Sequence, residues 1–366
     1  MRSLLVTGGA GFIGCNFVHY WVAQHPDDHV TVLDALTYAG NRASLASLTG
    51  HGKLKFVQGD ICNRELVERT LIAERVDTVV HFAAESHVDR SIAGPEVFIR
   101  TNVLGTHCLL EAARAVWLAG GAAVAHRFHH VSTDEVYGSL APDDPAFTET
   151  HPYAPNSPYA ASKAASDHLV RAYHHTYGLE VTLSNCSNNY GPYHFPEKLI
   201  PLMIVNLLLG KPLPIYGDGR NVRDWLHVSD HCRGIERVLS GGRPGSTYNI
   251  GGRSEVENLH LVQLLCNVAD ATFAARPDLR ERFPACPATS GSSCAQLVTF
   301  VKDRPGHDRR YAIDCSRIER DLGFRATVSL EAGLRDTFLW YLDHEGWWRG
   351  VMDGSYREWV KRHYGS

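Results

Sequence analysis

The sequence lacks several features that would assign it to a class at once. Its 366 residues carry a formal charge of −4 with a pI near 6.6, which leaves no chain-wide positive field for nucleic acid or an anionic membrane surface. The longest apolar run, residues 199–209, contains Pro201 and Asn206 and is too short to cross a bilayer. Glycines begin at position 8, too early for a signal-peptide core. We expect a cytoplasmic protein that binds neither nucleic acid nor membrane.

Cysteine and histidine do not form recognisable ligand groups. The nine cysteines include no Cys-x-x-Cys pair, and an odd number cannot all pair within one chain. We interpret them as reduced packing residues. His126, His129 and His130 are close in sequence, but neighbours on a strand point to opposite faces and no cysteine or carboxylate set has ligand spacing. We expect no metal ion.

The chain begins with an apolar run, residues 4–6, that leads into closely spaced glycines at 8, 11 and 14. This spacing after a strand permits a tight turn, backbone approach to a pyrophosphate and close packing of a helix on the strand. A helix is expected over 16–24, and a second strand, 29–33, ends in Asp34. A carboxylate there accepts hydrogen bonds from ribose hydroxyls and repels a 2′-phosphate, so the pattern predicts NAD rather than NADP.

Strands and helices then alternate. Apolar runs at 53–58, 77–82 and 127–131 are separated by helical patterns at 65–75 and 102–118. Such alternation predicts an α/β fold with a Rossmann-type, doubly wound parallel sheet. We assign residues 1–185 to this domain, with later segments returning to it, and 186–366 mainly to a smaller mixed α/β substrate-binding lobe.

The second half has a looser pattern. A strand is expected at 181–184 and a helix at 197–209. Strand-like runs at 213–216 and 222–228 flank Gly-Asp-Gly-Arg, which is a hairpin signal. Residues 271–296 show little periodicity, and we interpret them as a loop insertion on the surface.

Polar residues follow the fifth expected strand. Thr133, Asp134 and Glu135 stand at its carboxyl end, where open α/β sheets bind ligands, although such a pair of carboxylates also suits a plain turn or a helix cap. Tyr159 and Lys163, four residues apart, share one face of the next helix. An ammonium near the phenol, together with a positive nicotinamide, lowers the phenol pKa, which makes Tyr159 a candidate general base.

Basic residues of the second half are candidate ligands for a diphosphate, since guanidinium forks match phosphate oxygens. A solvated charged face is the alternative, and we expect two or three of them to be ligands. They are Lys198, Arg220, Arg223, Arg304, Arg309 and Arg310.

Together these features resemble the extended short-chain dehydrogenase/reductase superfamily and, within it, the dTDP-glucose 4,6-dehydratases. The segments at 7–14 and 159–163 are common to the superfamily, whereas the others are more specific. The specific ones are Ala-Ala-Glu-Ser-His-Val-Asp-Arg-Ser (83–91), Ser-Thr-Asp-Glu-Val-Tyr-Gly (132–138), Asn-Asn-Tyr-Gly-Pro-Tyr-His-Phe-Pro-Glu-Lys-Leu-Ile-Pro (188–201), Arg-Asp-Trp-Leu (223–226) and Asp-Arg-Pro-Gly-His-Asp-Arg-Arg-Tyr (303–311).

The resemblance implies three groups of site residues and a homodimer. The catalytic group is Thr133, Asp134, Glu135, Tyr159 and Lys163. NAD is expected to contact Gly8, Gly11, Phe12, Ile13, Gly14, Asp34, Thr37, Asp60, Ile61, Ala83, Ala84, Ser86, Thr101, Tyr159, Lys163 and Asn188. The nucleotide-sugar is expected to contact Ser86, Thr133, Asn188, Lys198, Leu199, Pro214, Ile215, Tyr216, Arg223, Asn258, Arg304 and His307.

The implied reaction oxidises C4 of dTDP-glucose with bound NAD⁺, eliminates water across C5–C6 and returns hydride to C6, giving dTDP-4-keto-6-deoxy-D-glucose. In this hypothesis Tyr159 is the base for the O4 proton, Glu135 the base at C5, and Asp134 the acid at C6. A nucleotide-sugar 4-epimerase is the alternative, but it has no role for the two carboxylates. A dehydratase acting on another NDP-hexose, such as UDP-glucose, differs by one methyl on the base. A non-catalytic NAD-binding protein is disfavoured because the catalytic set is complete.

Overall fold

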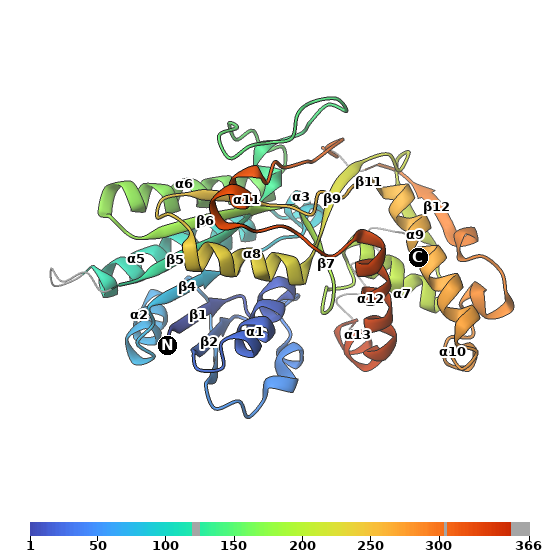
Figure 1. Cartoon of the computed structure of the whole chain (residues 1–366), viewed down its shortest axis with the longest axis horizontal. Helices are drawn as coiled ribbons and strands as arrows, with labels where there is room; N and C mark the ends of the chain where they lie inside the picture. Colours follow the sequence, from blue (N-terminus) through green and yellow to red (C-terminus); the bar gives the residue numbers. More distant parts are fainter. Residues whose placement is uncertain (119–124, 304–305, 353–366) are drawn as a thin grey trace.

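The structure, a computed structural model, describes residues 1–118, 125–303 and 306–352 (Figure 1). Within these residues, seven parallel strands form a central sheet in the order β10-β6-β5-β4-β1-β2-β3. The strands are β1 (Ser3–Thr7), β2 (His29–Asp34), β3 (Leu54–Gln58), β4 (Thr78–His81), β5 (Arg127–Thr133), β6 (Val181–Cys186) and β10 (Thr247–Ile250). The central strands β1, β4 and β5 are buried on both faces, which explains the apolar centres of β1 and β4; β5 instead buries polar side chains such as His129 and His130. The predicted doubly wound parallel sheet is confirmed.

Helices cover both faces of this sheet (Figure 1). On one face, α1 (Phe12–Gln24), α8 (Val228–Gly241) and α11 (Ser316–Leu322) share a core with β1 and β2. On the other face, α2 (Arg64–Ala73), α5 (Thr106–Trp117) and α6 (Pro158–Tyr177) pack on β4, β5 and β6. Each expected helix is present, and its ends differ from the expected ones by a few residues.

The expected helix over 102–118 begins earlier than its apolar pattern indicates. After α3 (Val88–Ala93), a nearly continuous helix runs through α4 (Glu96–Phe98), a π-helical segment η2 (Ile99–Gly105) and α5. A π-helical turn inserts an extra residue per turn and is frequent at functional sites. Here it brings Thr101 toward the edge of the sheet.

A second hydrophobic core lies beside the sheet, at the right of Figure 1. Its helices are α7 (Leu199–Leu209), α9 (Asn258–Ala275), α10 (Leu279–Arg282), α12 (Leu330–Asp343) and α13 (Glu345–Val351). Two small sheets, β11-β9-β7 and β12-β8, complete this part; they are formed by β7 (Asn188–Tyr190), β8 (Leu213–Tyr216), β9 (Val222–His227), β11 (Glu255–Glu257) and β12 (Val298–Val301).

The predicted hairpin between β8 and β9 is wrong. The turn itself is as expected, because Gly217 and Gly219 both have positive φ angles, 56° and 73°. However, β8 pairs with β12 and β9 pairs with β7 and β11, so the two strands separate into different sheets. Turn chemistry is local, whereas the choice of partner strand depends on segments distant in the sequence, such as β12 for β8 and β7 for β9.

The interpretation of residues 271–296 as a surface excursion is also wrong. This stretch contains the end of α9, α10 and two 3₁₀ turns, Pro287–Ser290 and Cys294–Leu297. Its apolar side chains join the second core: Leu279 and Cys294 are fully buried and Phe283 is 2% exposed. Elements of only four residues are too short to show a helical period, and for that reason the pattern was invisible in the sequence.

Across the described residues, no helix combines the length and the apolar character needed to span a membrane. Arg304, one of the predicted substrate ligands, lies outside the described residues.

Replacement of Phe283 by alanine tests the packing of this stretch. Because Phe283 is buried against Phe273, we expect Phe283→Ala to lower the free energy of unfolding by roughly 3–5 kcal/mol, measured by urea denaturation. Arg280→Ala, one turn away on the exposed side, is the control and should change it little. If both variants lowered the free energy of unfolding by the same small amount, residues 271–296 would be a surface loop, as the sequence suggested.

Candidate active site

A cavity of about 370 Å³ lies at the carboxyl ends of the parallel strands. Every residue predicted to contact NAD lines it, as do all five predicted catalytic residues. Their elements are far apart in the sequence, from the turn after β1 to the loop after β6. The parallel sheet brings them together because all its strands end at this edge.

The glycine turn leaves the backbone closely packed at one end of the cavity. Gly8 has φ +70°, and a Cβ there would lie 2.6 Å from the backbone nitrogen of Ala83. A Cβ on Gly14 would lie 2.2 Å from the Gly8 carbonyl oxygen. Helix α1 starts directly after Gly11 without a side-chain cap, so its first N–H groups and its positive dipole end are available to an anion. This arrangement fits a pyrophosphate.

Asp34 is held rigidly at the end of β2. Its carboxylate accepts hydrogen bonds from the backbone nitrogens of Ala10 (2.9 Å) and Leu36 (2.8 Å). The side chain lines the cavity beside Gly40, and its burial raises the pKa of the carboxyl. Each oxygen keeps a further lone pair, so the site fits a ribose diol, the group that distinguishes NAD from NADP.

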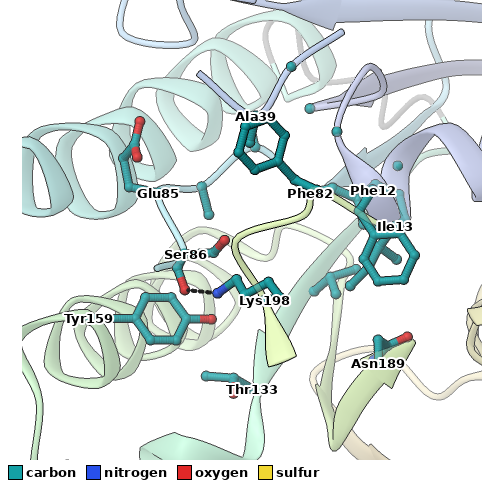
Figure 2. A pocket seen from close by; sticks show the side chains of 18 of the residues that line it. Phe12, Ile13, Ala39, Phe82, Glu85, Ser86, Thr133, Tyr159, Asn189 and Lys198 are labelled. Atoms are coloured by element: carbon teal, nitrogen blue, oxygen red, sulfur yellow. Dashed lines mark hydrogen bonds between the residues drawn. The ribbon is translucent and has the colours of Figure 1, made fainter. Parts of the chain in front are cut away.

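Local sequence positions the catalytic candidates. β5 ends at Thr133, whose hydroxyl accepts a hydrogen bond from the Glu135 nitrogen (3.3 Å) and caps the short 3₁₀ helix η3 (Asp134–Tyr137). Helix α6 is capped by Ser157, which accepts from the Ala160 nitrogen (3.1 Å), and Pro158 follows at its first position. Tyr159 therefore stands in the first turn of α6, facing Thr133 across the cavity (Figure 2).

The two adjacent carboxylates differ in environment. Asp134 is 1% exposed, whereas Glu135 is half-buried. Burial raises the pKa of Asp134 well above its ordinary value, the charges of Glu135 and Asp224 raise it further, and Arg223 opposes them. Asp134 Oδ2 makes no hydrogen bond within the described part of the chain. Burial therefore favours the protonated form of Asp134, as the role of acid requires.

Burial opposes the ionisation expected of Tyr159. We expected Lys163 and a nicotinamide to lower it, but within the protein burial raises the pKa of Tyr159 well above its ordinary value. The charge of Glu135 adds to this, and a hydrogen bond with Thr133 opposes it. The Lys163 ammonium donates to the Val131 carbonyl (2.9 Å) and lies 3.3 Å from His130 Nε2. The expected role of Lys163, to favour the phenolate through its positive charge, stays a prediction.

The predicted substrate residues fall into two groups. Ser86, Thr133, Asn188, Lys198 and Leu199 line the cavity. Lys198 Nζ donates to the Ser86 carbonyl (2.9 Å), which joins the loop after β4 to the segment before α7 (Figure 2). These are the cavity-lining members of the predicted set, and their roles remain predictions.

The second group stands apart from the cavity wall as far as the described residues show. The residues on strands are Pro214, Ile215 and Tyr216, on β8, and Arg223, on β9. Asn258 is the first residue of α9, and His307 lies between β12 and α11. Tyr216 and His307 are nevertheless neighbours, with ring centroids 6.0 Å apart, and Arg223 lies over the ring of Tyr311 at 4.3 Å. The sequence assigned them through resemblance, and their contact with a ligand stays a prediction.

Sequence reasoning missed several residues of the wall. Glu85 and Glu197 line the cavity, and Arg90 pairs with Glu197 at 2.9 Å. Glu85 lies in segment 83–91 and Glu197 in segment 188–201, so the family resemblance of these segments could have identified both glutamates. Nothing in the sequence pointed to Asn102, which supports the wall from behind. Its buried side-chain amide accepts a hydrogen bond from the Glu85 nitrogen (2.8 Å) and donates one to the Glu85 carbonyl (3.0 Å), and so fixes the loop after β4.

The sheet, the glycine turn and the Tyr159–Lys163 helix together define an enzyme of the extended short-chain dehydrogenase/reductase class. Comparison with known proteins narrows this class. The sequence profile of the GDP-mannose 4,6 dehydratase family matches residues 5–337. The dTDP-glucose 4,6-dehydratases of Xanthomonas campestris pv. campestris (strain B100) and Neisseria meningitidis serogroup B (strain MC58) are 56% and 53% identical to this chain, and each alignment covers 98% of both proteins.

Solved structures of dehydratases and epimerases have the same fold as this chain. DesIV, the dTDP-glucose 4,6-dehydratase of Streptomyces venezuelae with NAD and TYD bound, superposes with a TM-score of 0.85 at 50% identity, over 96% of this chain and 100% of that one. The UDP-glucose 4-epimerase of Thermotoga maritima gives 0.78 at 27% identity, over 93% and 99%. The chain belongs to the nucleotide-sugar 4,6-dehydratases and, among them, to the dTDP-glucose 4,6-dehydratase family, as its sequence indicated.

The protonation of Asp134 predicts a pH-dependent effect on stability. A carboxyl whose folded pKa lies above its unfolded value stabilises the fold below the unfolded pKa, near 3.8, and loses this contribution as pH rises toward the folded pKa. We expect Asp134→Asn, which stays neutral, to melt at a temperature equal to wild type near pH 4 and increasingly above it toward pH 8. Asp143→Asn, at an exposed position, should show no such trend. A variant that becomes relatively less stable as pH rises would mean that Asp134 is ionised.

Proposed function

We propose that the protein is an NAD-dependent dTDP-glucose 4,6-dehydratase, a hydro-lyase that converts dTDP-glucose into dTDP-4-keto-6-deoxy-D-glucose. The observation that carries the proposal is the pair Asp134 and Glu135 at the end of β5, beside Tyr159 in one cavity. Elimination of water needs an acid and a base, and burial raises the pKa of Asp134 while Glu135 stays closer to solvent. The family membership points to the same reaction.

Two parts of the cavity would hold NAD. The first N–H groups of α1 would bind the pyrophosphate, and the Asp34 carboxylate would bind a ribose. When bound, the cofactor would accept the hydride from C4 in its oxidised form and give it back to C6 in its reduced form. The remaining predicted contacts, from Thr37 to Asn188, line the same cavity.

In the first step, Tyr159 as phenolate takes the proton of the sugar's O4. Thr133, which lines the same cavity, stabilises the charge that develops on this oxygen. Lys163 provides the positive charge that offsets the cost of a buried phenolate. The product is a 4-ketone.

The ketone makes the C5 proton acidic, and this allows a carboxylate to remove it. Glu135 takes this proton, and Asp134 gives its own to the C6 hydroxyl, which leaves as water. The two carboxyls thus start in opposite protonation states and exchange them. Return of hydride to C6 and of a proton to C5 completes the redox-neutral reaction.

The nucleotide-sugar is held by the predicted set that includes Ser86, Asn188, Lys198 and Leu199 on the cavity wall and Tyr216 with His307 beyond it. The thymidine relatives support thymine over uracil. We further propose that the protein acts as a homodimer in the cytoplasm; the described structure is compatible with a reducing compartment, because all nine cysteines are free thiols.

A nucleotide-sugar 4-epimerase is the second candidate, since the fold is shared with epimerases at 27% identity. That reaction uses the tyrosine, the lysine and the hydroxyl, but it leaves Asp134 and Glu135 without a task. The carboxylates therefore favour the dehydratase.

Incubation of the purified protein with dTDP-glucose and, separately, with UDP-glucose tests the proposal directly. We expect a 4-keto-6-deoxy product from dTDP-glucose, detected by mass spectrometry as the loss of one water, and a slower reaction with UDP-glucose. Recovery of the starting sugar together with its C4 epimer would instead establish the epimerase.

The role of Glu135 predicts a separation of the two half-reactions. Glu135→Gln should still reduce bound NAD⁺ when dTDP-glucose is added, but should lose incorporation of solvent deuterium at C5 by about 10²-fold or more, because only the base for that proton is removed. Tyr159→Phe is the matched comparison and should block NAD⁺ reduction itself. Normal C5 exchange in Glu135→Gln would assign the base to another residue.

A further inference from the structure

A third ionisable residue continues the line of Tyr159 and Lys163 along α6. Asp167 follows Lys163 by four residues, as Lys163 follows Tyr159, so the three side chains share one helix face. Asp167 is fully buried and does not belong to the cavity wall. The reaction described above gives it no task, although burying a carboxylate is costly unless it is paired or hydrogen-bonded.

The carboxylate of Asp167 is strongly hydrogen-bonded on one oxygen. Oδ2 accepts from Ser132 Oγ (2.9 Å), from the hydroxyl of Tyr153 (2.9 Å) and, at 3.4 Å, from Asn185 Nδ2. Three donors on one oxygen favour the ionised form. These bonds come from β5, from the loop before α6 and from β6, so the position of the carboxylate is determined from three sides.

The other oxygen faces Lys163 through His130. Asp167 Oδ1 lies 3.2 Å from His130 Nε2, which lies 3.3 Å from Lys163 Nζ. Both His130 and Lys163 are buried, the histidine fully. The carboxylate and the ammonium thus meet at the same imidazole nitrogen in the protein interior.

Each ionisable neighbour of Lys163 other than Asp167 is a poor counter-charge. Burial lowers the pKa of His81 on β4 and of His130 on β5, which keeps both neutral. Burial raises the pKa of the Cys186 thiol on β6 and of the Tyr153 and Tyr137 phenols, which keeps these neutral as well. Burial raises the pKa of Asp134 on η3, which favours its neutral form, and Glu135 on η3 is needed as the base at C5.

We propose that Asp167 is a positioning residue for the oxidation step: its carboxylate keeps Lys163 in the charged ammonium form that Tyr159 needs to act as a base. The inference rests on the proposed function for the role of Tyr159. Burial lowers the pKa of Lys163, and the charge of Asp167 raises it. Burial raises the pKa of Asp167, while the charge of Lys163 and the three hydrogen bonds lower it and so favour the carboxylate. Asp167 acts on the reaction through Lys163, without touching substrate or cofactor.

A purely structural role is the competing explanation, because Asp167 also ties β5, β6 and the loop of Tyr153 together. The two explanations differ in what a neutral, isosteric side chain does. In Asp167→Asn, the amide oxygen can accept the same three hydrogen bonds, and the amide nitrogen takes the place of Oδ1 facing His130. The hydrogen bonds stay, and only the charge is lost.

We expect Asp167→Asn to fold with a melting temperature close to wild type and to shift the pH dependence of the reaction. Loss of the negative charge lowers the pKa of Lys163, and loss of the ammonium raises that of Tyr159. The acid limb of NAD⁺ reduction by dTDP-glucose should therefore move up by about one pH unit, a fall of about tenfold at pH 7 with little change in KM.

The ionisation of Tyr159 gives a readout that needs no substrate. The ultraviolet absorbance of tyrosinate in the NAD-loaded protein, taken as the difference from its Tyr159→Phe variant, reports the phenol directly. We expect its midpoint to be higher in the Asp167→Asn background. If wild type does not act on dTDP-glucose, the proposed function fails, while this titration still tests Asp167.

Tyr153→Phe is the matched control, because it removes one hydrogen bond to Asp167 and keeps the charge. It should lower the melting temperature more than it shifts either pH profile. An Asp167→Asn protein whose profile and phenol midpoint superpose on wild type would overturn the proposal and leave Asp167 a structural residue.

Discussion

The parallel arrangement of the central strands is the constraint on which the site depends. Because β1, β2, β4, β5 and β6 all run in the same direction, their carboxyl ends lie along one edge, and the residues after each strand meet there. An antiparallel partner at any of these positions would move its contribution to the opposite end of the sheet. The glycine turn, Asp34 and the Thr133–Glu135 segment form one cavity for this reason alone.

Burial then sets the chemistry of the groups that meet at this edge. Asp134 and Glu135 are adjacent and chemically similar, yet one is almost fully buried and the other half-buried. A low-dielectric surrounding penalises the charged form, so the pKa of the buried carboxyl is raised and its neutral form is favoured. The same penalty acts on Tyr159, which is therefore a poor base unless a buried positive charge compensates it. An enzyme that oxidises and then eliminates needs a neutral carboxyl and an ionised phenol within the same small region.

Local signals were readable where the chemistry is local. The glycine spacing, Asp34 after β2, and the four-residue interval between Tyr159 and Lys163 all follow from backbone geometry, and each lies where it was expected. The hairpin turn at Gly217 was also correct as a turn. Its strands nevertheless joined different sheets, because pairing is decided by distant segments such as β12. Short elements such as α10 were missed since four residues show no period.

By itself, the sequence determined the fold class, the family, the cofactor-type turn and the residues that line the cavity near β1, β2, β5 and α6, because these depend on spacing within a few turns of chain. Only the tertiary structure shows why the pKa of Asp134 is raised, why Tyr159 resists ionisation, and what surrounds Asp167. Each of these depends on desolvation and on charges brought from other elements, such as Asp224 beside Asp134 and Ser132 beside Asp167. Burial is a property of the assembled core, and no stretch of sequence contains it.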